Sequence, residues 1–195
     1  MGFFDWTAPL VDRYGCRWSR ADADQIVGWL GPLPAEGAAV LDVGGASGVL
    51  AALVADRTGA TVTVLDPTRA LLARLPSRPD IVGVEGRSER MPLPSESFDA
   101  VMCTDAFHHF GDQEAFARET RRVCRPGATV LVLDLDSGSV PRVIVWAERL
   151  VGEPAAFLTP AETAALFARH GIVGACEHTR RPSYRFLGTV TDEDG

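Results

Sequence analysis

Short apolar runs and amphipathic segments alternate along residues 38–135. Five runs have the composition of β-strands, at 38–43, 61–66, 80–85, 98–103 and 128–135. The stretches between most of them have the apolar spacing of helices, at 47–59, 68–75 and 112–127. Strands that are apolar on both faces and alternate with helices are typical of a parallel sheet covered on both sides. The pattern therefore predicts a doubly wound α/β fold.

The alternation changes in two places. The connection at 86–97 reads as a loop, so the helix expected there must be very short or missing. After the fifth strand come helical segments near 140–151 and 160–170, then two β-like runs at 173–181 and 183–191. Only antiparallel strands can be joined by so short a connection. We expect five parallel strands closed by a C-terminal antiparallel pair.

The first thirty residues have a helical pattern. Phe3, Phe4, Leu10, Val11 and Tyr14 could line one helix face. A second helix is predicted to begin near Asp22 and to carry Ile26, Val27 and Leu30. The aromatic residues Phe3, Phe4 and Trp6 would either pack on the core or cover a pocket for an apolar acceptor. We interpret the chain as one domain, residues 1–195, with an N-terminal helical lid region at 1–36 and a Rossmann-like core at 37–191.

Charge and composition narrow the class of partner. A net charge of -7 argues against nucleic-acid binding, which normally requires a basic face. No uncharged stretch is long enough for a membrane helix, and the N-terminal residues lack the features of an export signal or lipid anchor. The four cysteines are far apart, which gives no support for a disulfide framework or a metal site. We expect a cytoplasmic protein with a small-molecule partner and no bound metal; the oligomeric state is left open.

The stretch VLDVGGASGVLA at 40–51 places glycines directly after the first predicted strand. In an open parallel sheet, ligands bind beyond the carboxyl ends of the strands. The spacing does not fit the G-x-G-x-x-G fingerprint of dinucleotide sites, and the chain has no P-loop lysine motif. Asp66 closes the second strand, 22 positions after Gly44, where a carboxylate can accept both ribose hydroxyl protons. An adenosine ligand without a pyrophosphate is what remains.

Four motifs in this order resemble the class I S-adenosylmethionine-dependent methyltransferases, in particular the small-molecule type that includes quinone-biosynthesis C-methyltransferases. They are VLDVGGASG, LDP at 65–67, VEGRSERMPLPSESFDAV, and DAFHHFGDQEAFARETRRVCRPGATVLVLDLD. The resemblance covers residues 38 to about 190. It implies the sheet order 3-2-1-4-5-7-6 with helices on both faces, S-adenosylmethionine as the cofactor, and methyl transfer to a small-molecule acceptor. The implied chemistry is O- or C-methylation in bacterial secondary or quinone-like metabolism.

The resemblance also implies roles for individual residues. Asp42 would face the methionine ammonium, and the turn under the cofactor would consist of Gly44, Gly45, Ala46 and Gly48. Asp66 would hold the ribose and Pro67 would pack against the adenine. Arg87 and Ser88 would border the adenine edge, with the Ser88 backbone N–H as a donor, and Thr104 would lie under the methionine portion.

Two of these positions depart from the family pattern. Ala46 stands where a glycine is usual, and its methyl group would be penalised at a positive φ. Arg87 stands where an aspartate often accepts from the adenine amino group, and a guanidinium cannot accept. We therefore expect weaker cofactor binding than is usual in the family.

His108 and His109 follow the fourth strand, where an acceptor would meet the sulfonium. Either could be a general base, with Asp134 at the end of strand five helping to orient it, or the FHHF stretch could serve packing alone. Asp134 could instead cap a helix. The rival functions are a cofactor-binding fold with non-methylating chemistry, such as a cyclase or decarboxylase, a non-catalytic partner subunit, and a nicotinamide oxidoreductase.

Overall fold

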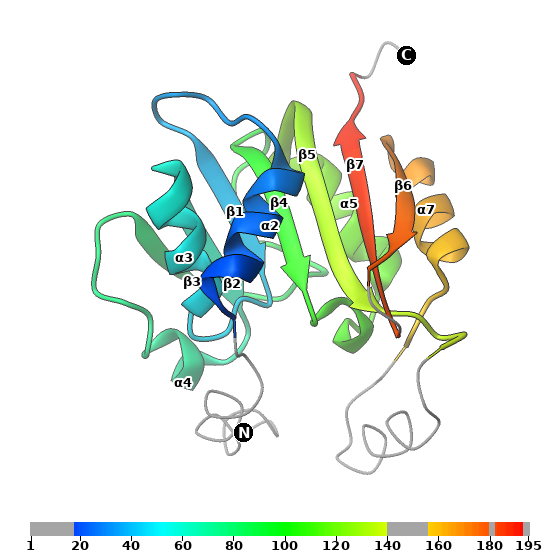
Figure 1. Ribbon diagram of the computed structural model, residues 1–195, viewed down its shortest axis with the longest axis horizontal. Helices are drawn as coiled ribbons and strands as arrows, with labels where there is room; N and C mark the ends of the chain where they lie inside the picture. The colour runs from blue at the N-terminus through cyan, green and yellow to red at the C-terminus, as the bar shows by residue number, and fades with distance from the viewer. Residues whose placement is uncertain (1–17, 140–155, 180–181, 193–195) are drawn as a thin grey trace.

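The computed structural model describes residues 18–139, 156–179 and 182–192. Their strands form one seven-stranded sheet in the order β3-β2-β1-β4-β5-β7-β6 (Figure 1). The strands are β1 (Ala39–Val43), β2 (Thr61–Asp66), β3 (Ile81–Glu85), β4 (Phe98–Thr104), β5 (Cys124–Leu135), β6 (Ile172–His178) and β7 (Ser183–Val190). Strands β1 to β5 are parallel, and β7 pairs antiparallel with both β5 and β6. The predicted fold class and sheet order are confirmed.

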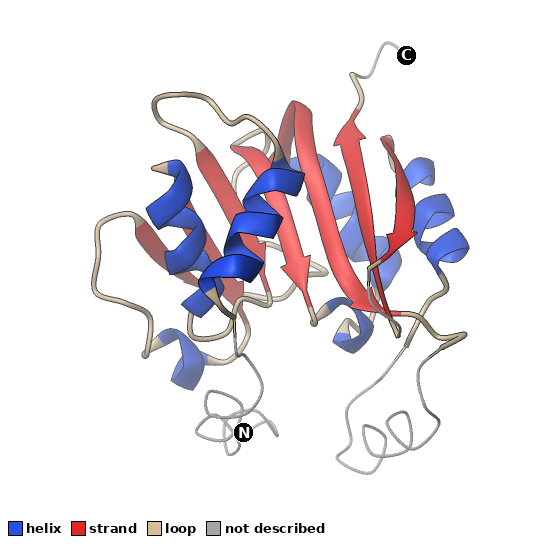
Figure 2. Ribbon diagram, viewed as in Figure 1, coloured by secondary structure: helices blue, strands red, loops and turns tan. Residues whose placement is uncertain are grey.

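Helices cover both faces of the sheet (Figure 2). Helix α2 (Arg20–Leu30) and helix α3 (Val49–Thr58) lie on the face nearer the viewer in Figure 1, and α5 (Gln113–Val123) and α7 (Pro160–Arg169) lie behind it. Each face is filled by its own apolar cluster. Strands β1 and β2 are buried along almost their whole length, as a parallel sheet between two helical layers requires.

The helix starts follow capping rules that the sequence contains. The Ser19 hydroxyl accepts from the Asp22 backbone N–H at 3.2 Å, and the Asp22 carboxylate accepts from the Ser19 N–H at 2.8 Å. Thr159 and Glu162 form the same reciprocal cap at α7. Side chains Ala23, Ile26 and Leu30 of α2 are buried in the core, which confirms the predicted second helix.

Several predicted boundaries differ from the observed ones. The segment 112–127 was expected to be helical to its end, but α5 ends at Val123 and β5 begins at Cys124. Pro126 disfavours the helical conformation of the residue before it, and Cys124 already has extended angles, φ −77° and ψ 142°. Helix α4 is a single turn, Arg69–Leu72, instead of the expected 68–75. The segment 86–97 contains no helix, as predicted. Residues 1–17 and the expected helix at 140–151 lie outside the described residues.

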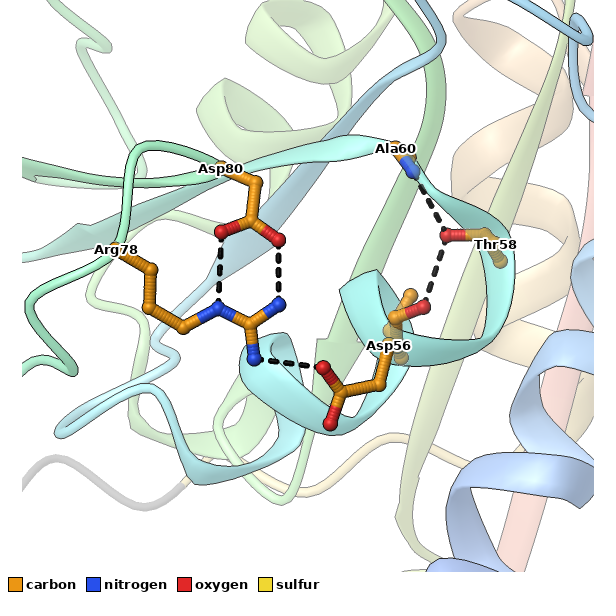
Figure 3. Close-up of polar contacts among 6 residues, drawn as sticks. Asp56, Thr58, Ala60, Arg78 and Asp80 are labelled. Atoms are coloured by element: carbon orange, nitrogen blue, oxygen red, sulfur yellow. Dashed lines mark hydrogen bonds and ion pairs between the residues drawn. The ribbon is translucent and has the colours of Figure 1, made fainter.

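An ion-pair cluster fastens edge strand β3 to α3 at the amino ends of the strands (Figure 3). The Arg78 guanidinium donates to Asp80 at 2.9 Å through Nε and to Asp56 at 2.7 Å through its Nη1. This pairing holds the pKa of Asp80 below its usual range. The cluster lies at the end of the sheet opposite the carboxyl strand tips, so its contribution is structural.

Helix α7 is joined to β7 by a buried hydrogen bond between the hydroxyls of Thr163 and Tyr184, at 2.7 Å. Both side chains are fully buried. Because a buried hydroxyl without a partner costs about 1–3 kcal/mol, Tyr184→Phe and Thr163→Val should each destabilise the protein by that order. The double variant should lose less stability than the sum of the losses in the two single variants, since it leaves no buried hydroxyl without its partner. Urea unfolding of the four proteins measures the coupling; strictly additive losses would show that the bond contributes nothing.

Candidate functional site

The glycine turn 44–48 follows β1 in the chain and is hydrogen-bonded to the carboxyl end of the neighbouring strand β2. The Gly44 N–H donates to the Leu65 carbonyl at 2.8 Å, and the Gly48 N–H donates to the Gly45 carbonyl at 2.9 Å. A Cβ at Gly44, which has φ 77°, would lie 2.6 Å from the Cβ of Ala106 beyond the end of β4. A Cβ at Gly45 would lie 2.4 Å from Oδ2 of Asp42. The turn therefore needs these glycines because the tips of three strands meet there.

Ala46 adopts a left-handed conformation with φ 51°. A positive φ is the unfavourable case named in the sequence analysis, since the left-handed conformation costs an L-residue roughly 1–2 kcal/mol. Ala46 and Asp105, at φ 52°, are two of the three non-glycine residues with positive φ in the part of the chain that the structure describes. Asp105 directly follows β4 and Ala46 lies in the turn after β1, both at the carboxyl edge of the sheet, and backbone strain of this kind is common in functional sites.

Asp42 is a buried carboxylate with 1 % of its surface exposed. Neither of its oxygens has a hydrogen-bond partner among the described residues. Burial, together with the nearby charge of Asp66, raises the pKa of Asp42 to about 7. A group of this kind favours a cationic ligand, because an ammonium would replace the water that burial removed.

Asp66, at the end of β2, supports the same turn. Its Oδ2 accepts from the Ala46 N–H at 3.1 Å, and its Oδ1 accepts from the Thr68 N–H at 2.8 Å. Burial raises the pKa of Asp66, and the Thr68 and Ala46 hydrogen bonds oppose that rise. Each carboxylate oxygen has a second lone pair, so Asp66 can still accept from a ligand. Pro67, the next residue, is exposed.

A small cavity opens beside Asp42 and the glycine turn. Its lining comes from Trp18, Asp42, Gly44, Gly45, Ser47, Val49, Leu50 and Thr104. Four of these residues were predicted as site residues: Asp42, Gly44, Gly45 and Thr104. Trp18, Ser47, Val49 and Leu50 were not predicted. Trp18 precedes the Ser19 cap of α2, and a lone aromatic residue at a helix start carries no signal that it faces a cavity.

Arg87 and Ser88 lie in a tight turn after β3, separate from the residues that line this cavity. The Arg90 N–H donates to the Arg87 carbonyl at 3.2 Å. The Ser88 residue is 6 % exposed, whereas the Arg87 side chain is 78 % exposed and lies 3.9 Å from Glu89. The Arg87 side chain therefore extends into solvent, and the turn itself borders the tips of β2 and β3.

His108 forms a buried pair with Asp134. The one-turn 3-10 helix η2 (Phe107–His109) follows β4 and carries both histidines. Nδ1 of His108 lies 2.6 Å from Oδ1 of Asp134, which also accepts from the Leu135 N–H at 2.7 Å. Since a carboxylate only accepts, Nδ1 is the donor, and Nε2 of His108 is left as the basic nitrogen. This is the arrangement of a general base with an orienting carboxylate.

His109 differs from His108 although the two ring centroids are 4.0 Å apart. Burial and the charge of His108 lower the pKa of His109 to about 4. Its imidazole is therefore neutral at neutral pH.

Asp136, two residues after Asp134, accepts from the Gly138 N–H at 2.9 Å and from the Ser139 hydroxyl at 3.0 Å, so it stabilises the turn after β5.

Phe157 is a further member of the site that the sequence did not reveal. Its ring stacks on His108, with the centroids 4.6 Å apart and the planes at 16°. Phe157 lies 49 positions after His108, and an isolated aromatic residue before a helix gives no indication of its partner. The carboxyl edge of the sheet thus holds two groups: the Asp42 cavity with Asp66, and the His108 cluster.

Comparison with known proteins supports the expected resemblance to methyltransferases. Residues 41–132 match the family model described as a methyltransferase domain. An uncharacterised protein of Mycobacterium tuberculosis is 34% identical over 139 residues, which cover 64% of this chain and 50% of that protein. A ubiquinone biosynthesis O-methyltransferase of Paracidovorax citrulli is 35% identical over 139 residues, covering 65% of this chain and 57% of the relative. The matched part of the chain thus spans about half the length of these relatives.

The similarity in fold to known structures covers almost the whole chain. The structure of an S-adenosylmethionine-dependent methyltransferase from Thermotoga maritima aligns with a TM-score of 0.75 at 19% identity, over 97% of this chain and 99% of that one. At this identity the similarity is one of fold.

The raised pKa of Asp42 predicts how stability depends on pH. The folded protein holds this proton up to about pH 7, whereas the unfolded chain releases it near the ordinary aspartate pKa of 3.8. The contribution to stability is therefore present below pH 3.8 and is lost as pH rises towards 7. Asp42→Asn cannot ionise, so its stability relative to wild type should increase between pH 4 and pH 8 by more than about 1 kcal/mol, since one pKa unit corresponds to about 1.4 kcal/mol. Denaturant unfolding of both ligand-free proteins at pH 4 and pH 8 measures this change. If the difference in unfolding free energy between Asp42→Asn and wild type is the same at both pH values, the raised pKa of Asp42 is contradicted.

Proposed function

Because residues 41–132 match the methyltransferase domain model, we propose that this protein binds S-adenosylmethionine at the tips of β1 and β2 and transfers its methyl group to a small-molecule acceptor. The observation that carries the proposal is Asp42. Its carboxylate is buried and has no hydrogen-bond partner in the described residues, and it lines a cavity next to the glycine turn. The ammonium of a bound methionine tail would supply the missing partner, which offsets the cost of burying the charge.

The other cofactor residues fit the same ligand. Asp66 would accept from the ribose hydroxyls while it continues to hold the Ala46 N–H. Pro67 is exposed beside it and is available to pack against the adenine. Ser88 is buried in the turn after β3, so its backbone, rather than its side chain, would border the adenine. Thr104 and Gly45 would lie against the amino-acid tail, because both line the Asp42 cavity.

The two departures from the family pattern have different consequences. Ala46 keeps the left-handed turn that a glycine would adopt without strain, so the shape of the turn is retained. The Arg87 side chain lies in solvent and offers no acceptor for an adenine amino group. We propose that weaker adenine recognition, not a distorted turn, is the main cost of these substitutions.

S-adenosylmethionine supplies a methyl carbon that a positively charged sulfur has already activated. The protein contributes alignment and the exclusion of water, and orientation alone can lower a barrier by about 7–11 kcal/mol. Asp42 and Asp66 would fix the two ends of the cofactor. His108 would accept a proton from the acceptor at Nε2, while Asp134 holds Nδ1 and stabilises the imidazolium that forms.

The His108–Asp134 pair favours an acceptor that loses a proton during the reaction. Both O-methylation of a phenol or enol and C-methylation of an activated ring carbon meet this condition. The similarity to the ubiquinone biosynthesis O-methyltransferase of Paracidovorax citrulli supports the O-methyl case. We propose an uncharged, partly aromatic hydroxyl compound of secondary or quinone-like metabolism as the acceptor class.

Release of S-adenosylhomocysteine is the decisive measurement. Purified protein is incubated with labelled S-adenosylmethionine and a panel of phenols, catechols and hydroxyquinones, and the product is quantified. Acceptor-dependent release supports methyl transfer. Tight cofactor binding with no release across the panel would favour the rival functions, a cyclase, a decarboxylase or a non-catalytic subunit, which leave the cofactor intact.

The remaining expectations concern partners and location. No helix among the described residues is long and apolar enough to cross a membrane. Cys103 and Cys124 are buried free thiols, and a reducing cytoplasm stays the proposed location. A small molecule remains the proposed partner, and nucleic acid is not expected because of the net charge of -7.

We predict that Asp66→Ala weakens S-adenosylmethionine binding by about tenfold or more, because the ribose loses its acceptor and the turn loses a support. Isothermal calorimetry measures the Kd. Asp56→Ala is the matched control, since it removes an aspartate from the Arg78 cluster at the opposite end of the sheet (Figure 3). If Asp66→Ala binds S-adenosylmethionine with unchanged affinity, Asp66 is not the residue that holds the ribose.

We predict that His108→Ala lowers kcat by about 10²–10⁴ with any acceptor that the panel identifies, the range expected for loss of a general base. The Kd for S-adenosylmethionine should stay at the wild-type value, because His108 is not among the residues that line the Asp42 cavity. A smaller loss is expected for His109→Ala, whose pKa of about 4 makes it a weak base. Normal turnover by His108→Ala would place the base elsewhere or show that none is needed.

A further inference from the structure

Residues 156–158 lie against the turn that carries His108, although the two segments are far apart in the sequence. The Ala156 N–H donates to the His108 carbonyl at 2.8 Å. Phe157 then places its ring on the His108 imidazole. The Leu158 carbonyl accepts from the Ser137 N–H at 3.3 Å, which joins the segment to the turn after β5. This segment therefore touches the residues after both β4 and β5.

Gln113 connects the two segments through one side chain. Its Nε2 donates to the Phe107 carbonyl at 3.0 Å and to the Ala156 carbonyl at 2.8 Å. A primary amide has two N–H donors on one nitrogen, so a single Gln can hold two carbonyls at a fixed separation. Gln113 is the first residue of α5, and Asp112 caps this helix by accepting from the Ala115 N–H at 2.9 Å. The helix start is thus satisfied by Asp112, and both Gln113 bonds described here leave the helix.

We infer that Gln113 is a positioning residue for His108. This inference rests on the proposed function, in which His108 is the general base. The Gln113 amide fixes the separation between η2 and residues 156–158, and so keeps Phe157 stacked on the imidazole. Asp134 fixes Nδ1 in the plane of the ring, and Phe157 fixes the tilt of that plane. Nε2 then has one direction in which to meet the acceptor, and placement within about 0.5 Å is what efficient proton transfer demands.

Nuclear magnetic resonance of the imidazole tests this without an acceptor. Gln113→Met keeps the length of the side chain and removes both donors, and Gln113→Glu keeps its shape but presents a carboxylate to two carbonyls. Arg118→Met is the matched control, because Arg118 is exposed on the same helix. Histidine-labelled protein gives the His108 ring signals, assigned with His108→Gln, and amide exchange gives the protection of the Ala156 N–H.

In wild type and Arg118→Met, the His108 ring protons should show the ring-current shift and cross-peaks of a stacked Phe157. In both Gln113 variants the cross-peaks should disappear, and the Ala156 amide should exchange about tenfold faster or more, because its local opening becomes easier. The Kd for S-adenosylmethionine should stay at the wild-type value. A merely structural role would alter unfolding but leave the His108 signals unchanged.

The inference is overturned if the His108 signals of either folded Gln113 variant coincide with those of wild type. Failure of the proposed function gives a different result, since wild-type protein would then bind no S-adenosylmethionine, or bind it without releasing S-adenosylhomocysteine across the acceptor panel, while the Gln113 effect on His108 persisted. Two Gln113 variants are used so that poor folding of one still leaves the other to decide.

Discussion

The arrangement of the candidate site depends on a buried carboxylate that has no hydrogen-bond partner among the described residues. Asp42 is the residue before the last in β1, a strand that is buried on both faces, and Gly45 must lack a side chain because a Cβ there would touch the Asp42 oxygen. The glycine turn, the Asp66 contact to Ala46 and the tip of β4 are all arranged around that carboxylate. The sheet provides the rigidity that keeps such a group out of water, and the cost of burying its charge is the physical basis of the proposed cationic ligand.

The two groups of site residues have separate mechanical supports. The cofactor group depends on β1, β2 and the backbone of the turn between β1 and α3. The His108 group depends on η2, the end of β5 and the segment before α7, with Gln113 as the link between elements. The proposed cofactor residues lie on strand tips and the proposed acceptor residues lie on turns, which is consistent with one fold that serves many acceptors, since turns can change without disturbing the sheet.

The sequence predicted the sheet because its signals are local. Buried strands are continuous apolar runs, and capping residues such as Ser19 and Thr159 mark helix starts directly. The site was partly predictable for the same reason: Asp42, Gly44, Gly45 and Thr104 follow strands and line one cavity. Long-range contacts were not predictable. Trp18, Gln113 and Phe157 reach the site only through packing between distant segments, and the end of α5 at Val123 depends on pairing of Cys124 with Phe98.

The position of β7 has a consequence for how the protein is made. This strand lies between β5 and β6, and its register places Tyr184 opposite Asp134 and Ser183 opposite Leu135. The stretch of β5 that presents the orienting carboxylate therefore has a free edge until residues 183–190 have left the ribosome. In a nascent chain β1 to β4 can pair early, because these strands pair among themselves, whereas the half that holds His108 and Asp134 must wait until residues 183–190 have been translated.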